Sequence, residues 1–532
     1  MWHRLAVRDL VVLLVSFVAG IVVAVLVVRP LAAPQIGFDT AASVLHFQRL
    51  VAGERLEAFV TTTPKPLLTL VDGVLHALGG WTAVAWGAMA MHGLAAGLVA
   101  TLAGRLGGPV AAAWVAVALI GNGFLLVEAS YAYAVPVAVA LWSAAGLAVT
   151  ETRPRWGLAG SALLLATLAR FETLVIVAVS AVVLVAAAFV ARSLRRRGDA
   201  VRALPRRAWL LVLLPLAALP IMLAHDWLLT GDPFFWSTVS ERYTAQARQR
   251  TAIAGPAEVV LSIAGLVTAQ GLVAILAVVG GLWLAWRRAW VGLVALAALG
   301  PAMAGFLVLL AARGTYVSGR YGAPIELAVL FAAGIGLAWL VGLTGLVGGR
   351  PAANARTGLT HPAGQLAAAG ATAAVAAIAL MPWGPFDAAL TERIATERAL
   401  QANAALALPA IAEALDRIPG SRDRPALSAG VTVPSGRRPV LLVPGLLRPR
   451  LAVDLDLPVD VVGGLTAAGL DPDAGLIGPG QVIIHDPRGG QAARAFRFLE
   501  TTEPFTDRGL AFRPVFVDPA RRIWVHAVTA AP

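Results

Sequence analysis

The chain has 532 residues, of which 58% are hydrophobic and 14% charged, with a formal net charge of +12 and no cysteine. A soluble globular chain carries about 25% charged residues, so this composition excludes that class. The missing cysteines exclude disulfides and thiolate metal sites. Because the apolar residues come in blocks of about 18–25, the length that crosses the hydrocarbon core as a helix, the sequence predicts an α-helical polytopic membrane protein.

The first apolar run covers residues 10–31 and is too long for the apolar region of a cleaved signal, so we interpret it as a retained span. The stretch 66–80 is interrupted by Asp72 and His76 and is predicted to be an interfacial helix. In chain order the sequence predicts about eleven spans, at residues 10–31, 82–103, 108–127, 130–149, 157–170, 173–191, 208–227, 258–285, 289–311, 322–345 and 365–382.

The excess positive charge lies in the short breaks between apolar runs, where arginines cluster, as at Arg105 and in residues 192–207. This is the positive-inside pattern. It predicts a multi-pass protein of the cell membrane with a cytoplasmic N-terminus and an extracytoplasmic C-terminal segment. Since the charge is explained by topology, no nucleic-acid partner is expected.

Residues 383–532 differ from the transmembrane domain, 1–382, and are predicted to form an extracytoplasmic soluble α/β domain. An amphipathic helix over 388–418 comes first. Short β-branched runs bounded by Gly, Pro and Asp then predict strands, with a helix over 490–500. The four predicted strands cover residues 438–445, 459–464, 480–486 and 521–528.

Asp39 follows the first span and opens a helical stretch on which Ser43, His46 and Leu50 lie on the same face. Aspartate is a favoured N-cap, which is one interpretation of Asp39. The other is a catalytic carboxylate at the outer membrane surface.

Lys65 is the only lysine of the chain and stands between two prolines at the same predicted boundary. It is suited to hold a phosphate as a point charge. The alternative is a side chain that snorkels to the interface.

Further charged side chains fall at this outer boundary. Glu128 ends the third predicted span, where a carboxylate is costly unless it faces a polar cavity; otherwise it is a loop residue. Arg170 and Glu172 occupy a tight reversal between two apolar runs and form either a structural pair or a pocket wall.

Before the span at 322–345 stand Arg313, Arg320 and Tyr321. Arginine is suited to bidentate recognition of phosphate. No Walker loop, dinucleotide fingerprint, HExxH, EF-hand or GxSxG motif occurs, so cytosolic nucleotide chemistry is not indicated.

Over residues 10–345 these motifs resemble, in order and spacing, those of the C-fold (GT-C) glycosyltransferases, which take sugars from polyprenyl-phosphate donors at the outer membrane face. Asp39 matches the acid of their first outer loop. Matching segments are PKPLLTL (64–70), ARFETL (169–174), TGDPFFW (230–236) and GRYGAP (319–324). Two features depart from subfamilies: Thr40 stands where protein O-mannosyltransferases carry Glu, and the WWD-x-G motif of oligosaccharyltransferases is absent.

The resemblance implies a GT-C-like fold and inverting transfer of a sugar from a polyprenyl-phosphate donor to a hydroxyl of a cell-envelope glycan, glycolipid or protein. It implies Asp39 as general base. Candidate ligands of the donor phosphate are Lys65, Arg320, Arg170 and Arg313, and candidate ligands of the substrates are Glu128, Glu172, His46 and Tyr321. No cofactor is expected; a divalent metal between Asp39 and Glu128 is the alternative.

Two other classes stay open at this stage. Acids and arginines at one membrane face would also serve a transporter or flippase of a lipid-linked substrate. A non-catalytic scaffold that binds cell-envelope glycan is the third. The composition, rich in Ala, Arg and Gly with one lysine, is typical of a GC-rich bacterium. In an actinobacterium, mannose or arabinofuranose on decaprenyl phosphate would be the natural donors, so mannosyl or arabinosyl transfer is the expected activity.

Overall fold

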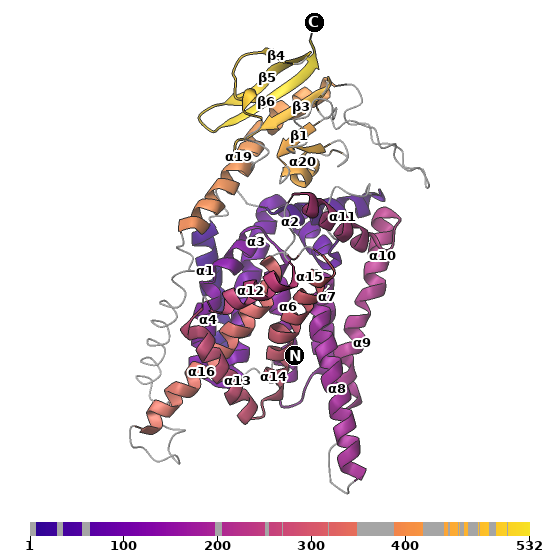
Figure 1. Cartoon of the computed structure of the whole chain (residues 1–532). Coiled ribbons are helices and arrows are strands. Elements are labelled where there is room, and N and C mark those ends of the chain that lie inside the picture. The colour runs from indigo at the N-terminus through magenta and orange to yellow at the C-terminus, as the bar shows by residue number, and fades with distance from the viewer. Residues whose placement is uncertain are drawn as a thin grey trace.

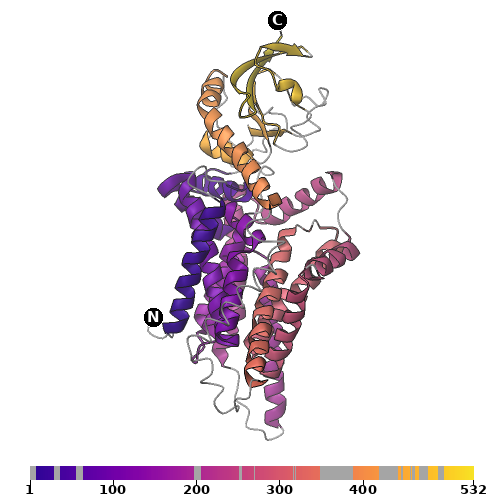
Figure 2. The ribbon, with the colours of Figure 1, turned by 90° about the vertical axis from the view of Figure 1, so that its left-hand side faces the viewer.

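A helical bundle carries a small sheet domain at one end (Figure 1). The computed structural model describes residues 7–28, 36–55, 64–196, 205–250, 255–268, 270–315, 317, 319–347, 388–418, 441–444, 447–455, 457, 462–465, 477, 479–488, 496–507 and 509–531. Helix α1 begins at the end of the bundle that lies away from the sheet domain and runs towards it (Figure 2).

The bundle consists of helices of very different lengths. They are α1 (Val7–Val28), α2 (Phe38–Ala52), α3 (Pro66–Gly107), α4 (Pro109–Ile120), α5 (Gly123–Ser130), α6 (Ala134–Val149), α7 (Trp156–Ala169), α8 (Thr173–Arg196), η1 (Arg206–Trp209), α9 (Leu210–Leu216), α10 (Ala218–Thr230), α11 (Phe235–Arg250), α12 (Pro256–Thr268), α13 (Leu272–Trp286), α14 (Trp290–Ala297), the π-helical η2 (Ala298–Ala302), α15 (Met303–Ala312), η3 (Gly319–Gly322) and α16 (Ala323–Val347).

Among the described residues, six helical segments are long and apolar enough to cross a membrane. Two further pairs, α4 with α5 and α12 with α13, reach this length and hydropathy only together and are bent by 52° and 92°. Helices α6 and α7 are apolar but shorter. Each predicted span between residues 10 and 345 coincides with one of these elements, so the prediction of a multi-pass membrane protein is confirmed. The predicted span 365–382 and the predicted boundary after residue 382 lie outside the described residues.

Glycines mark two sharp bends, one at a predicted boundary and one inside a predicted span. Helix α3 leaves helical dihedral angles at Gly79 and Gly80, and the φ of 61° at Gly80 is one that favours glycine. Its first limb is the helix predicted for 66–80, and its second limb is the next span. The predicted single span 258–285 is instead α12 and α13 at 92° to one another, with Gly271 at φ 50° before α13.

The C-terminal domain combines helices α19 (Ala388–Asp416) and α20 (Arg448–Asp454) with one six-stranded sheet. The strands are β1 (Leu441–Pro444), β2 (Val462–Leu465), β3 (Gln481–His485), β4 (Phe505–Asp507), β5 (Leu510–Asp518) and β6 (Ile523–Ala530). Their order is β2-β1-β3-β6-β5-β4, parallel from β2 to β3 and antiparallel beyond.

The α/β class predicted for this domain is confirmed, but its strand list was incomplete. Strands β4 and β5 were missed because Pro514 interrupts the β-branched run of β5, and the pairing with β6 shifts register between Pro514 and Phe516. Helix α20 was missed as well. Of the helix predicted over 490–500, the described residues 496–500 form only the 3-10 turn η10 (Arg497–Leu499).

Two apolar clusters hold these parts together. The larger packs around Trp114 within the bundle. The second continues from the bundle into the sheet domain without a break and includes Leu45 of α2, Leu400 of α19, Leu451 of α20 and Val482 of β3. The sheet domain therefore shares a core with the helix that follows the first span.

Helices α13 and α16 approach each other backbone to backbone. A methyl group added at Gly336 would lie 2.1 Å from the carbonyl oxygen of Leu276, and one added at Gly280 would lie 1.9 Å from that of Ala332. Small residues allow this closeness between membrane helices.

We expect Gly336→Leu to force α13 and α16 apart and to cost at least about 2 kcal/mol of stability, because the clash is with backbone. Thermal unfolding of the detergent-solubilised protein checks this. Gly342→Leu on the same helix is the control, since nothing lies within 4 Å of a methyl group added there. Equal unfolding temperatures for the two variants would contradict the packing argument.

Candidate active site

The entry to α2 is held tightly against the turn between α5 and α6. Gly37 donates its backbone N–H to the carbonyl oxygen of Tyr131 at 2.9 Å, and the Thr40 hydroxyl donates to the carbonyl oxygens of Tyr131 and Ala132, both at 2.9 Å. A methyl group added at Gly37 would lie 2.3 Å from the ring of Tyr133. Glycine is therefore required where this segment crosses the tyrosine.

Asp39 lies in the first turn of α2 and is not its N-cap. The cap is Gly37, which makes no side-chain capping bond. The capping interpretation of Asp39 was wrong. Its carboxylate Oδ2 instead accepts a hydrogen bond from Lys65 Nζ at 3.1 Å, and both side chains are partly exposed, at 15% and 21%.

Lys65 is the N-cap of α3, directly before Pro66. Its ammonium therefore stands at the positive end of the helix dipole, a place that favours an anion. The pair of Asp39 and Lys65 brings a carboxylate and a cation from two different helices to one point.

His46 lies about two turns after Asp39 on α2 and is 1% exposed. Neither of its ring nitrogens has a hydrogen-bond partner among the described residues, and the same holds for Nε2 of His225 on α10. Burial lowers the pKa of His46 from 6.5 to about 3, and the nearby His225 and Lys65 act in the same direction. His46 is therefore neutral at physiological pH.

Arg170 and Glu172 form a second charged group between α7 and α8. Two guanidinium nitrogens of Arg170 donate to Glu172, at 3.0 and 3.4 Å. The guanidinium also lies 5.9 Å from the ring centroid of Tyr321. Burial lowers the pKa of Arg170, but the charges of Glu172 and then of Glu128 outweigh it and raise the pKa above its ordinary value.

The two groups are electrostatically connected through Lys65. Burial raises the pKa of Glu172, but the charge and hydrogen bonds of Arg170, with a smaller effect of Lys65, bring it below its ordinary value. The charge of Lys65 thus lowers the pKa of both His46 and Glu172. The structure gathers the following sequence-derived candidates: Asp39, His46, Lys65, Glu128, Arg170, Glu172 and Tyr321.

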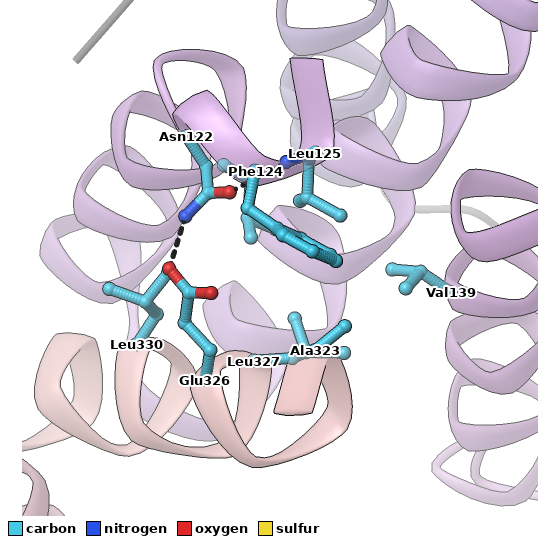
Figure 3. A pocket seen from close by; sticks show the side chains of 9 residues that line it. Asn122, Phe124, Leu125, Val139, Ala323, Glu326, Leu327 and Leu330 are labelled. Carbon is cyan, nitrogen blue, oxygen red and sulfur yellow. Dashed lines mark hydrogen bonds between the residues drawn. The ribbon is translucent and has the colours of Figure 1, made fainter. Parts of the chain in front are cut away.

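Helix α5, which carries the buried Glu128, is fixed by a polar contact inside the bundle (Figure 3). The Asn122 side chain caps α5 by accepting from the backbone N–H of Leu125 at 2.8 Å, and it donates to Glu326 Oε1 of α16 at 2.6 Å. Apolar side chains such as Phe124 and Leu330 line the small pocket around it. Glu326 therefore has a structural partner at the bend between α4 and α5.

Two of the candidate arginines are not brought into this group by any described contact. Arg313 is exposed and ends α15. The backbone of Arg320 lies in η3, and the placement of its side chain is outside what the structure describes. Their roles stay predictions from the sequence.

Sequence reasoning missed His225 and Asp226 at the end of α10. Asp226 is 1% exposed; its Oδ2 accepts the backbone N–H of Trp236 at 2.8 Å, and its Oδ1 lies 3.3 Å from Nδ1 of His225. Trp236 in turn stacks on Phe171, beside Arg170. The signal was an adjacent His and Asp at the end of the predicted span 208–227.

No protein-family model matches the chain, and no curated protein sequence does. Solved structures of ArnT from Cupriavidus metallidurans, an aminoarabinose transferase with the GT-C fold, match it nearly end to end. The structure bound to undecaprenyl phosphate has a TM-score of 0.53 at 16% identity, covering 98% of this chain and 99% of that chain. The chain has the GT-C fold.

The apo structure of ArnT gives a TM-score of 0.50 at 15% identity, covering 98% of each chain. A GT-C oligosaccharyltransferase of Archaeoglobus fulgidus, tethered to an acceptor peptide, gives 0.49 at 12% identity and covers 86% of this chain and 63% of that chain. Within the GT-C fold of this chain, no three His, Cys, Asp or Glu side chains of the described residues are arranged as metal ligands.

Because buried His46 is neutral in the fold and takes up a proton near pH 6.5 when unfolded, folding is favoured above that pH and weakened as the pH falls towards 3. Between pH 7 and pH 5 we expect the free energy of unfolding of wild type to fall by about 2 kcal/mol more than that of His46→Gln, because the glutamine takes up no proton. Thermal unfolding at both pH values measures the difference. An identical pH dependence in wild type and variant would contradict the buried, neutral histidine.

Proposed function

We propose that the chain is an integral membrane glycosyltransferase that moves a sugar, with inversion, from a polyprenyl-phosphate donor to a hydroxyl of an extracytoplasmic glycan, lipid or protein. The observation that carries this proposal is the contact of Asp39 with Lys65 at 3.1 Å. It occurs in a chain whose GT-C fold matches, over 98% of its length, that of ArnT bound to undecaprenyl phosphate.

In the proposed reaction Asp39 is the general base. Its carboxylate takes the proton of the acceptor hydroxyl while that oxygen attacks the anomeric carbon. The bond from the anomeric carbon to the phosphate oxygen breaks, and its electron pair leaves with the lipid phosphate. A carboxylate that is only partly exposed and held by a helix start is suited to this step.

Lys65 stabilises the charge that grows on the departing phosphate. It stands at the N-cap of α3, where the helix dipole adds to its own charge. A phosphate that draws Lys65 to itself also releases the Asp39 carboxylate to act as a base. Lipid binding and activation of the base are thereby coupled in one contact.

The second charged group forms the sugar side of the site in this proposal. Glu172 is ionised and oriented by Arg170, so its carboxylate can accept hydroxyl hydrogen bonds, and Glu128 lies near Arg170. Arg320 and Arg313 are retained as further phosphate ligands on sequence grounds.

As the resemblance implies, we propose transfer without a bound metal, so EDTA should leave the rate unchanged.

We also propose that the sheet domain is extracytoplasmic. Helix α1 begins at the far end of the bundle (Figure 2), where Arg105 pairs with Asp9 at 2.9 Å and Arg8 donates to the carbonyl oxygen of Gly104. Arginine-rich ends of membrane helices face the cytoplasm. The pair of Asp39 and Lys65 then lies at the outer face, where lipid-linked donors present their sugars.

We expect Asp39→Asn to lower transfer by at least about 10³-fold while leaving donor-lipid binding intact, because the amide cannot take a proton. The assay uses purified protein with polyprenyl phosphates carrying mannose, arabinose or aminoarabinose. Glu413→Gln is the matched control, since Glu413 forms an exposed ion pair with Arg417 in α19. Transfer by Asp39→Asn at the wild-type rate would overturn the assignment of the base.

A further inference from the structure

The segment that leads into Asp39 is held by a residue more than 360 positions later in the chain. Gln401 of α19 accepts a hydrogen bond from the backbone N–H of Ile36 at 2.8 Å and donates to the carbonyl oxygen of the same residue at 2.7 Å. Both residues are buried, with Gln401 5% and Ile36 2% exposed. One side chain thus satisfies both backbone groups of Ile36, three residues before Asp39.

Gln401 is itself fixed from the other side. Its Oε1 also accepts from Nη1 of Arg450, on α20. The guanidinium of Arg450 lies 5.7 Å from the ring centroid of Trp81, and Asp454 accepts from Trp81 Nε1 at 2.6 Å. Since Trp81 opens the second limb of α3, the network runs from a membrane span through α20 to Gln401 and Ile36.

The far end of α2 is held by the same domain. Nη2 of Arg49 donates to the carbonyl oxygen of Leu457 at 3.0 Å, and Arg49 also pairs with Glu54. Helix α2 is therefore fixed to the C-terminal domain at its entry and at its exit. Between these points, its apolar face belongs to the core that continues into the sheet.

We propose that the C-terminal domain positions the general base, and that Gln401 is the positioning residue that does so by fixing the backbone of Ile36. The inference rests on the proposed function, in which Asp39 is the base. Ile36 precedes Gly37, the N-cap of α2, so a displacement of Ile36 passes along the backbone through Gly37 to the first turn that carries Asp39. Gln401 fixes Ile36 in both hydrogen-bonding directions. Gln401 touches neither Asp39 nor Lys65 in any described contact; its effect on the reaction passes through the backbone.

The experiment compares Gln401→Ala with Asn403→Ala. Asn403 is a matched control because it is a buried amide two residues along α19 whose two hydrogen bonds, to Asp486 at 3.2 Å and to the carbonyl oxygen of Arg521 at 2.6 Å, stay within the C-terminal domain. Both variants remove a buried side-chain amide from α19. Only Gln401→Ala releases Ile36.

Two readouts are taken on the full-length protein in detergent or nanodiscs. Hydrogen–deuterium exchange of the peptide covering residues 36–46 reports on the entry to α2. Steady-state transfer reports kcat and the donor KM separately. For Gln401→Ala we expect faster exchange in this peptide and a kcat lowered by roughly tenfold to a hundredfold, as for a small displacement of a catalytic group, with the donor KM within about twofold.

For Asn403→Ala we expect exchange of residues 36–46, kcat and KM close to wild type. An equal loss in both variants, or a loss carried by KM, would show a general structural role for Gln401 and overturn the proposal. Unchanged exchange in Gln401→Ala would overturn it as well. If wild type transfers no sugar from any donor, the proposed function fails, and the exchange measurement still decides whether Gln401 holds α2.

Discussion

The arrangement depends on one contact between two helices, the 3.1 Å bond from Lys65 at the start of α3 to Asp39 at the start of α2. Each partner lies where a helix begins, so backbone geometry sets its position more firmly than a loop would. The contact brings the only lysine of the chain against a carboxylate, and the charge of this lysine also lowers the pKa of His46 and of Glu172. The charged groups at this end of the bundle are therefore arranged around it.

That contact is stable only because α2 is confined on several sides. The turn between α5 and α6 accepts hydrogen bonds from Gly37 and Thr40, and Gln401 takes both backbone groups of Ile36. The shared apolar core stabilises the packing of the sheet domain against α2 through the hydrophobic effect, which has no preferred direction. A domain that looks separable in the sequence is thus part of the framework of the site.

Much of the bundle was predictable, because apolar runs of a fixed length report membrane spans directly. The break inside 258–285 was not, since Gly271 permits but does not require a turn. Asp39 and Lys65 could be singled out from their residue types and their place after a span, while their mutual distance needed the fold. Gln401 carried no signal, because a glutamine on an amphipathic helix is ordinarily a solvated residue. Its partner is the backbone of Ile36, and because every residue except proline carries the same backbone groups, no sequence pattern predicts this contact.

A structure of the protein with bound undecaprenyl phosphate tests the central claim most directly. The account predicts that Lys65 Nζ lies about 3 Å from a phosphate oxygen, the normal hydrogen-bond distance, and that the Asp39 carboxylate borders the space next to that phosphate. A phosphate bound away from Lys65, with the contact between Lys65 and Asp39 unchanged, would contradict it.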